Sequence, residues 1–323
     1  MERTHKRYSS EDREKAFEVF KSTGEIQDAL LVFFDQHGKW VGYMYSGMIS
    51  KYNASLSKQR IPKKRLIKTC EDGRKILLSS FRSGSSKRIE LDYHHVIGSL
   101  EARRTREFRA PNLAIVDGGM WIESARVIHL PVLDEVNMQL TAESLTIVDL
   151  PNLKTVDGSL VFNGAHVINT PKLETVNYEV QARSAYTFFT PRLRWASQLS
   201  LNSARILHVP NLKAVGRIDA KCVTYFDAPE LEVVYNDICV IKAIDIHAPR
   251  LQEVQHSLVV SSAINFHAPS LKSVQSELDA GSATNFDALK LETVGRLILP
   301  PETLHAAVRA GCKAAIAIFA EGM

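Results

Sequence analysis

The stretch AINFHAPSLKSV, residues 263–274, decides how this sequence folds, because variants of it recur through most of the chain. Two residues after each proline of the series stands a leucine, and three residues further on a valine, with Ala196 as the one exception. The prolines are 20 residues apart, or 19 in two steps, and comprise Pro111, Pro131, Pro151, Pro171, Pro191, Pro210, Pro229, Pro249 and Pro269, with Leu289 in the next place. A fixed period of this length predicts a solenoid, whose units bury their apolar sides only against their neighbours.

Each unit contains two short runs in which apolar and polar residues alternate. One is Leu160-Val161-Phe162 and its equivalents, and the other runs from Ala263 to Pro269 and its equivalents. Alternation predicts strands with one side in a core and one side in water. Proline cannot donate a ladder hydrogen bond, so it belongs at the bend just past the strand. The large apolar residue three places before each proline is expected to form an internal column: Ile128, Val148, Ile168, Phe188, Leu207, Phe226, Ile246, Phe266 and Phe286.

The unit pattern F-x-A-P-x-L-x-x-V resembles the leucine-rich repeat superfamily, and is most similar to the short BspA-like repeats of bacterial proteins. The resemblance covers residues 105–300. It implies a curved solenoid that binds other proteins. The unit is short and has no regular asparagine ladder, which departs from the commonest pattern of that superfamily. After Pro300-Pro301, residues 302–316 predict a helix that covers the last open edge of the solenoid.

The chain has 323 residues, of which 45% are hydrophobic and 24% charged. This composition excludes wholesale disorder. The longest apolar runs, Ala29 to Phe34 and Ala314 to Ala320, are too short for a transmembrane helix. No secretory signal is recognisable, and the four cysteines show no CxxC pairing. We therefore expect a cytoplasmic protein with reduced thiols, or one delivered into a host cell without a signal peptide.

Charge divides the chain into two parts. Residues 1–105 carry 21 Lys and Arg against 13 Asp and Glu, whereas the remainder carries 19 against 23. The basic part is expected to form a small α+β module, with helices over residues 9–22 and 25–34 that resemble the first two helices of a helix-turn-helix unit. A basic run follows: Lys58, Arg60, Lys63, Lys64, Arg65 and Lys68. It predicts either a patch that binds nucleic-acid phosphates or a solvated loop.

Polar residues two places before each proline predict an outward column, because paired strands lie about 4.8 Å apart. Its C-terminal end contains Asp227, His247, His267 and Asp287. Such a column suits a pH-sensitive surface or a metal ion, with His247, His267 and Asp287 as the candidate ligands, and it equally suits an ordinary solvated strand. In the N-terminal module, Asp92 and His94 would share one face of a strand, as a metal or acid–base site requires.

The second strand of each unit predicts another exposed column. In leucine-rich repeat proteins the surface of such a strand is usually the binding face, and the resemblance implies the same here. Aromatic anchors beside charges are typical of protein interfaces. The candidate interface residues are Trp121, Glu123, Glu143, Asn163, Arg183, Asn202 and Lys221, and Cys239, Ile241 and Val259 form a more apolar patch.

The sequence therefore predicts an α+β fold: a leucine-rich-repeat-type β-solenoid of about ten 20-residue units over residues 106–299, preceded by a module over 1–105 and closed by a capping helix over 300–323. No catalytic motif is recognisable, and no cofactor is expected. The expected function is a non-enzymatic scaffold or adaptor for a protein partner, with a bacterial effector as a special case. The alternative is a DNA-binding regulator that uses the basic module.

Overall fold

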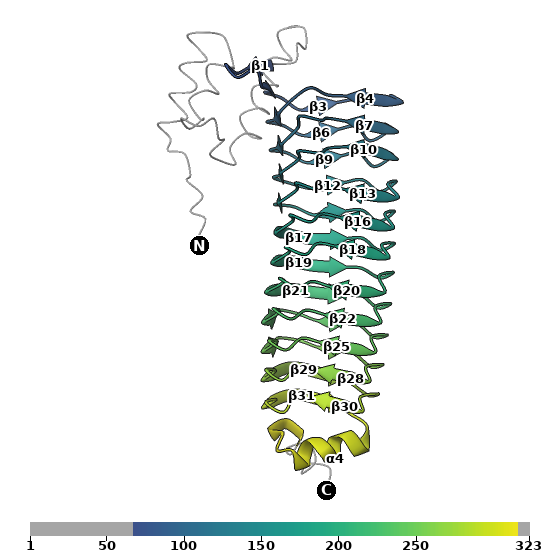
Figure 1. The fold of residues 1–323 in the computed structure, drawn as a ribbon, viewed down its shortest axis with the longest axis vertical. Coiled ribbons are helices and arrows are strands. Elements are labelled where there is room, and N and C mark those ends of the chain that lie inside the picture. Colours follow the sequence, from purple (N-terminus) through teal and green to yellow (C-terminus); the bar gives the residue numbers. More distant parts are fainter. Residues whose placement is uncertain (1–66, 316–323) are drawn as a thin grey trace, which may run out of the picture. The chain divides into compact units, whose positions relative to one another are not determined.

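The computed structural model describes residues 67–315, and its internal contacts divide the chain into two units, residues 1–71 and 72–323. The described part of the first unit contains strand β1 (Ile67–Thr69). The second unit is a β-solenoid of about 11 turns, followed by helix α4 (Pro301–Arg309) (Figure 1). The helices expected over residues 9–22 and 25–34 lie outside the described residues.

One side of the solenoid, here called face A, consists of eleven three-residue strands that each run into a bend. They pair in parallel within three sheets, and successive partners are 19 or 20 residues apart, as in Ile246 beside Phe266. The strands are β4 (Arg88–Glu90), β7 (Glu107–Arg109) and β10 (Val127–His129); β13 (Ile147–Asp149), β16 (Val167–Asn169) and β18 (Thr187–Phe189); and β20 (Ile206–His208), β22 (Tyr225–Asp227), β25 (Asp245–His247), β28 (Asn265–His267) and β30 (Asn285–Asp287).

The rest of each turn, here called face B, contributes two further strands with a bend between them. The first set is β2 (Lys75–Leu77), β5 (His95–Val96), β8 (Ile115–Val116), β11 (Glu135–Val136), β14 (Thr155–Val156), β23 (Val233–Val234) and β26 (Glu253–Val254). The second set is β3 (Phe81–Arg82), β6 (Leu100–Glu101), β9 (Met120–Trp121), β12 (Leu140–Thr141), β15 (Leu160–Val161), β24 (Ile238–Cys239) and β27 (Leu258–Val259). In five turns one longer strand spans both positions: β17 (Thr175–Gln181), β19 (Trp195–Ser200), β21 (Ala214–Asp219), β29 (Ser273–Asp279) and β31 (Thr293–Ile298).

The strand around the repeated valine is a third strand, added to the two that the alternation predicts. Its apolar alternation is only two residues long, as in Glu135-Val136, which is too short to be recognised as a strand from sequence. The register between neighbouring turns changes at the bend of face B and, once, at the bend after face A, where β4 pairs with β7 at an offset of 19 residues and β5 pairs with β8 at an offset of 20. Between β17 and β19 it shifts by one residue between Val176 and Glu179, and between β29 and β31 it shifts between Val274 and Glu277. The two 19-residue steps between prolines, from Pro191 to Pro229, are therefore absorbed at the bend of face B.

The core is a set of continuous inward columns, as the sequence predicts. The leucines that follow the prolines are at most 2% exposed, and the valine column from Val116 to Val274 is fully buried. In the phenylalanine-rich column of face A, the rings of Phe266 and Phe286 stack with centroids 5.4 Å apart. Burial of this apolar surface is the main stabilising contribution, because no single turn has a core of its own.

Each proline stands at the second position of a tight turn that ends face A. The amide of Leu271 donates to the carbonyl of Ala268 across Pro269 at 3.0 Å, and equivalent bonds recur from Leu113 to Leu291. Proline suits this position because its fixed φ matches the turn and its missing N–H is not needed there. Leu289 occupies the same position in the last turn, where Leu291 donates to Ala288 at 3.0 Å.

Strand pairing in the solenoid begins with β2, which pairs with β5, while β3 pairs with β6 and β4 with β7. Residues 75–105, which the sequence assigned to the N-terminal module, thus form the first turns of the stack. At the other end, α4 packs on the last turn. Its Thr303 hydroxyl donates to the carbonyl of Ala283 at 2.5 Å, and Ala307 and Cys312 are buried in the same cluster.

Candidate functional site

Trp121 lies on the outer side of β9, in the column that the second strand set was predicted to form. Its register partners are Glu101 on β6 and Thr141 on β12. The guanidinium of Arg103 lies over the indole, 5.2 Å from the ring centroid, and also pairs with Glu123. A Cβ at position 119 would collide with the indole ring, so the ring lies against Gly119. Trp121 is therefore held in one orientation by a cation–π contact and a glycine.

The other predicted interface residues follow Trp121 along the corner of successive turns, and the set of seven is called here the Trp121 surface. Asn163 donates to the side chain of Gln181 at 3.3 Å, and the backbone N–H of Arg183 lies 3.5 Å from Asn163 Oδ1. Asp219 links the next members, since it lies 3.8 Å from Lys221 Nζ and accepts from the amide of Asn202 at 3.3 Å. Glu143 is exposed. Several polar groups of this surface are thus held by neighbouring side chains, chiefly Arg103, Gln181 and Asp219, before any partner binds.

Polar side chains continue around the middle of the Trp121 surface. Glu179 accepts from Ser200 at 2.6 Å and from Gln181 at 2.6 Å.

Further along, Cys239 pairs in register with Val259, and both are partly exposed. Burial raises the pKa of the Cys239 thiol, and the nearby carboxylate of Asp219 raises it further. This thiol therefore stays protonated at neutral pH and behaves as part of an apolar patch.

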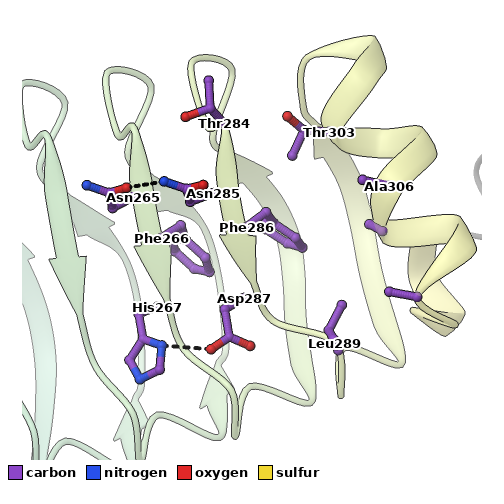
Figure 2. Close-up of a pocket in the computed structure, with 12 residues that line it drawn as sticks. Asn265, Phe266, His267, Thr284, Asn285, Phe286, Asp287, Leu289, Thr303 and Ala306 are labelled. Carbon is purple, nitrogen blue, oxygen red and sulfur yellow. Dashed lines mark hydrogen bonds and ion pairs between the residues drawn. The ribbon is translucent and has the colours of Figure 1, made fainter.

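The predicted polar column on face A is present, with its members in register from His208 to Asp287. His208 Nδ1 lies 2.5 Å from Asp227 Oδ2, and His267 Nδ1 lies 2.7 Å from Asp287 Oδ2, the latter pair being visible in Figure 2. The rings of His247 and His267 stack with centroids 5.1 Å apart and planes inclined by 5°.

The metal candidates His247, His267 and Asp287 are thus neighbours, but their donor atoms do not converge. Lone pairs of imidazole nitrogens lie in the ring plane, so two parallel stacked rings direct them side by side. Within residues 67–315, no group of three or more His, Cys, Asp or Glu side chains is arranged to hold a metal ion. The geometry favours a ladder in which two stacked imidazoles lie between two carboxylates over a coordination site.

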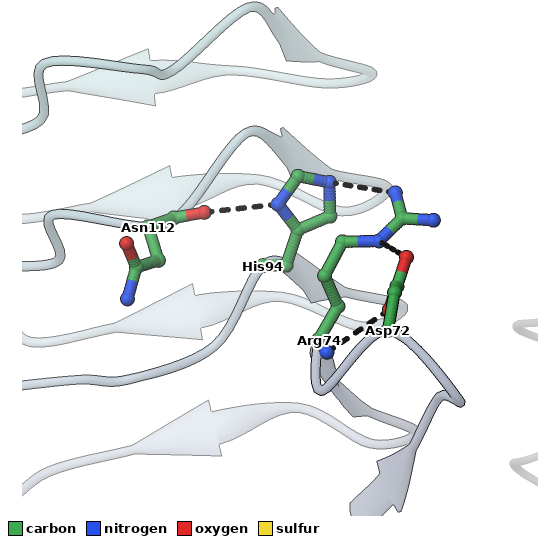
Figure 3. Close-up of polar contacts among 4 residues, drawn as sticks. All are labelled: Asp72, Arg74, His94 and Asn112. Atoms are coloured by element: carbon green, nitrogen blue, oxygen red, sulfur yellow. Dashed lines mark hydrogen bonds and ion pairs between the residues drawn. The ribbon is translucent and has the colours of Figure 1, made fainter.

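Asp92 and His94 lie in the bend between β4 and β5, and not on a strand as expected. They meet at Asn112 of the next turn: Asp92 accepts from its amide at 2.8 Å, and His94 Nδ1 lies 3.2 Å from its carbonyl oxygen. Figure 3 shows the His94 ring between this carbonyl and Arg74, which in turn contacts Asp72.

Electrostatics at this bend follow from these contacts. A hydrogen bond from Lys75, 2.7 Å away, lowers the pKa of Asp92, and the bond from Asn112 adds to the effect. Burial lowers the pKa of His94, and the adjacent Arg74 guanidinium lowers it further. Asp92 is therefore ionised and His94 neutral at pH 7. These protonation states fit a bend with a purely structural role, and they fit an acid–base pair equally well.

Of the predicted phosphate-binding run, Lys58, Arg60, Lys63, Lys64 and Arg65 lie outside the described residues, and Lys68 lies in β1. The run therefore keeps the two interpretations that the sequence offers, a phosphate-binding patch or a solvated loop.

Sequence reasoning missed the exposed apolar side chains of face A. Of fifteen large apolar residues exposed among residues 67–315, nine lie on or directly before strands of this face. We call this set the apolar stripe: Val127, Ile147, Val167, Tyr186, Phe189, Ile206, Tyr225, Ile244 and Ile264. The signal in the sequence is the residue four places before the proline, where Val127, Ile147, Val167 and Ile206 are aliphatic although their side chains point outward.

Stacked parallel turns, continuous core columns and short strands define a β-solenoid repeat protein. No protein-family model matches the sequence, and no curated protein is significantly similar to it. Among residues 67–315, no helix is long and apolar enough to cross a membrane.

Proposed function

We propose that this β-solenoid is a non-enzymatic scaffold or adaptor that binds a protein partner on the Trp121 surface. The observation that carries the proposal is the fixed indole of Trp121, flanked by Arg103 and Glu123. A rigid aromatic side chain beside charges loses little conformational entropy on binding, which is the property of a binding hot spot. The in-register polar side chains that follow it over several turns offer an extended surface, which suits a protein better than a small ligand.

The test uses a glycine substitution that changes the orientation of the indole while the Trp121 side chain itself is kept. Gly119→Ala places a Cβ where the Trp121 ring lies, so we expect the ring to swing away from Arg103. Gly84→Ala is the matched control, because no atom lies within 4 Å of its new Cβ. Tagged full-length chain, the two variants and Trp121→Ala would be compared in affinity capture followed by mass spectrometry.

We expect a defined partner to bind the unmodified chain and Gly84→Ala, and to be lost from Gly119→Ala and Trp121→Ala. Purified partner should then show the same order in titration calorimetry, with the affinity reduced by about ten-fold or more, as for a hot-spot residue. Equal binding by all four chains would refute the proposed site. Unchanged far-UV circular dichroism of Gly119→Ala serves as the check on folding.

We also propose a repeat superfamily, a cellular location and a role for helix α4. Leucine at a fixed place after each bend supports a relation to the leucine-rich repeat superfamily, with the short BspA-like repeats as the model. Cys70, Cys222, Cys239 and Cys312 all carry free thiols, which supports a reducing compartment, either the cytoplasm or a host cell reached by a bacterial effector. Packing of α4 on the last turn supports its role as a cap.

A second candidate function, a DNA-binding regulator, is supported by the excess of basic residues in positions 1–105. Duplex DNA would be titrated with the full chain while fluorescence anisotropy is recorded at increasing salt. Counterion release predicts that the logarithm of the affinity falls steeply with the logarithm of the salt concentration. Replacing Lys63, Lys64 and Arg65 by glutamine should reduce the magnitude of that slope by about 3, which is about one for each lost phosphate contact. Absence of binding at low salt would exclude this function.

A further inference from the structure

A cavity lies where the last turn of face A meets helix α4, and we call it the α4 cavity. Its volume is about 450 Å³, which is in the range of small-molecule sites. Helix α4 takes the place of a further face A strand, since Thr303 bonds to the carbonyl of Ala283, 20 residues earlier. The apolar lining consists of Phe266, Phe286, Leu289, Ala306, Ala307 and Ala310 (Figure 2).

The end of the phenylalanine-rich column forms one wall of the α4 cavity. Phe266 is only 1% exposed, because the ring of Phe286 stacks on it. Phe286 is the last member of the column and is only partly buried, since α4 presents alanine methyl groups to it instead of another large side chain. An aromatic ring in the cavity would therefore occupy the next place in the column and stack on Phe286.

Two hydrogen-bond acceptors stand beside this place. Asn265 donates to Asp245, and Asn285 donates to Asn265 at 2.6 Å, so this ladder ends on the side-chain oxygen of Asn285. The carboxylate of Asp287 contacts His267 through one oxygen, 2.7 Å from Nδ1. Figure 2 shows the Asn285 oxygen and the second Asp287 oxygen on the side of α4. Both oxygens are thus available to donors of a ligand.

The spacing and charge of these acceptors define the ligand further. Asn285 and Asp287 are two residues apart on β30, so their positions are about 6.6 Å apart and suit donors at opposite ends of one ring. The ionisable residues that line the cavity are His267 and Asp287. Those near them in sequence that do not line it are Lys290, Glu302, His305 and Arg309. A carboxylate without a lysine or arginine in the lining favours a cation.

We infer that the α4 cavity binds a small aromatic cation. Its ring stacks on Phe286, its ammonium group pairs with Asp287, and a donor at the far end of the ring bonds to Asn285. The cavity shares no residue with the Trp121 surface, so this inference and the proposed scaffold function stand or fall independently.

Nuclear magnetic resonance of the full chain, with ¹³C-labelled alanine methyl groups, tests this inference. The probe is 4-hydroxyphenylethylamine, which has a ring, an ammonium group and a second donor. We expect the Ala306 and Ala310 methyl signals to shift, with a dissociation constant of about 1 mM or below for a ligand of this size. The matched compounds 4-hydroxyphenylacetate, with the opposite charge, and n-butylamine, without a ring, should bind about ten-fold more weakly or less.

Two substitutions locate the site. Ala306→Leu fills the cavity from an exposed helix position and should abolish binding, whereas Arg309→Leu puts the same side chain on α4 outside the lining and should not. Asp287→Asn should weaken binding of the ammonium probe by about ten-fold. Asp245→Asn, two strands away, should change it by less than about two-fold. Unchanged far-UV circular dichroism checks the folding of each variant.

The outcomes separate clearly. Equal binding of the three compounds would overturn the inferred ligand class. Binding that survives Ala306→Leu, or that ignores Asp287→Asn, would overturn the inferred site. Absence of shifts in the unmodified chain at about 10 mM probe, roughly ten times the expected dissociation constant, would overturn the inference altogether.

Discussion

Replacing Thr190 by valine should stabilise the solenoid. Thr190 is 1% exposed, and its hydroxyl has no hydrogen-bond partner among the described residues. Leu150 and Val209 occupy the equivalent place in their turns, directly before the proline, and are fully buried there. The site therefore accepts an apolar side chain, and valine has nearly the shape of threonine.

The magnitude follows from the unmade hydrogen bond. A buried polar group without a partner costs about 1–3 kcal/mol, and the valine methyl group adds no volume that the site must accommodate. We expect the free energy of unfolding to rise by about 1–2 kcal/mol. For a unit of this size, each 1 kcal/mol corresponds to a rise in Tm of about 2–4 °C. Urea titration and thermal melting followed by circular dichroism would measure both quantities.

Thr141→Val is the matched control, since Thr141 is buried but its hydroxyl accepts from the Gln139 amide at 2.7 Å. The same substitution there should lower the unfolding free energy by about 0.5–1.5 kcal/mol. Thr170 also has an unpartnered buried hydroxyl, so Thr170→Val should resemble Thr190→Val. If Thr190→Val and Thr141→Val shift stability in the same direction, the assignment of the unpartnered hydroxyl is wrong.

Leu289→Pro should slow hydrogen exchange around residues 285–293 by about two-fold to five-fold, because proline restricts the unfolded chain and so stabilises the turn by about 0.4–1 kcal/mol. Pro249→Leu should speed hydrogen exchange in its own turn by a similar factor. Faster exchange in Leu289→Pro would contradict the turn geometry. Leu231→Ala should cost about 2–5 kcal/mol in urea titration, since Leu231 is fully buried between rigid turns that cannot collapse on the cavity. A loss below about 1 kcal/mol would contradict that rigidity. Burial lowers the pKa of His94, so the folded chain binds this proton less readily than the unfolded chain. Stability should be constant above about pH 6.5 and fall as the pH drops toward the folded pKa. Nuclear magnetic resonance titration would locate that pKa, and His94→Gln should remove this part of the pH dependence.

Much of the solenoid could be predicted from sequence because the period repeats the same physical choice many times. Leu231 or Val254 alone indicates little, but a leucine and a valine at fixed distances from each proline locate the bend and two buried columns. The outward column from His208 to Asp287 followed from the same counting. Whether this column can hold a metal ion could not be predicted, since the parallel stacking of His247 on His267 depends on side-chain rotation and not on spacing.

Three features could not be predicted from the sequence, each for an identifiable reason. The valine strand is two residues long, so its alternation is not distinguishable from that of a loop. The apolar stripe was missed because outward aliphatic residues such as Ile147 in a strand look like additional core residues until the register fixes which side they face. The order of Asp92, His94 and Asn112 at one bend likewise depends on contacts between residues about 20 positions apart.

The bend of face B, where the register shifts, makes the solenoid tolerant of small changes in length. A turn can lose one residue at this bend, as between β17 and β19, while face A and the valine column keep their alignment. Single-residue insertions or deletions should therefore accumulate at the face B bend, between the valine and the next strand. The spacing between neighbouring strands of face A therefore stays the same toward a partner on that side, whichever turns lengthen or shorten at the face B bend.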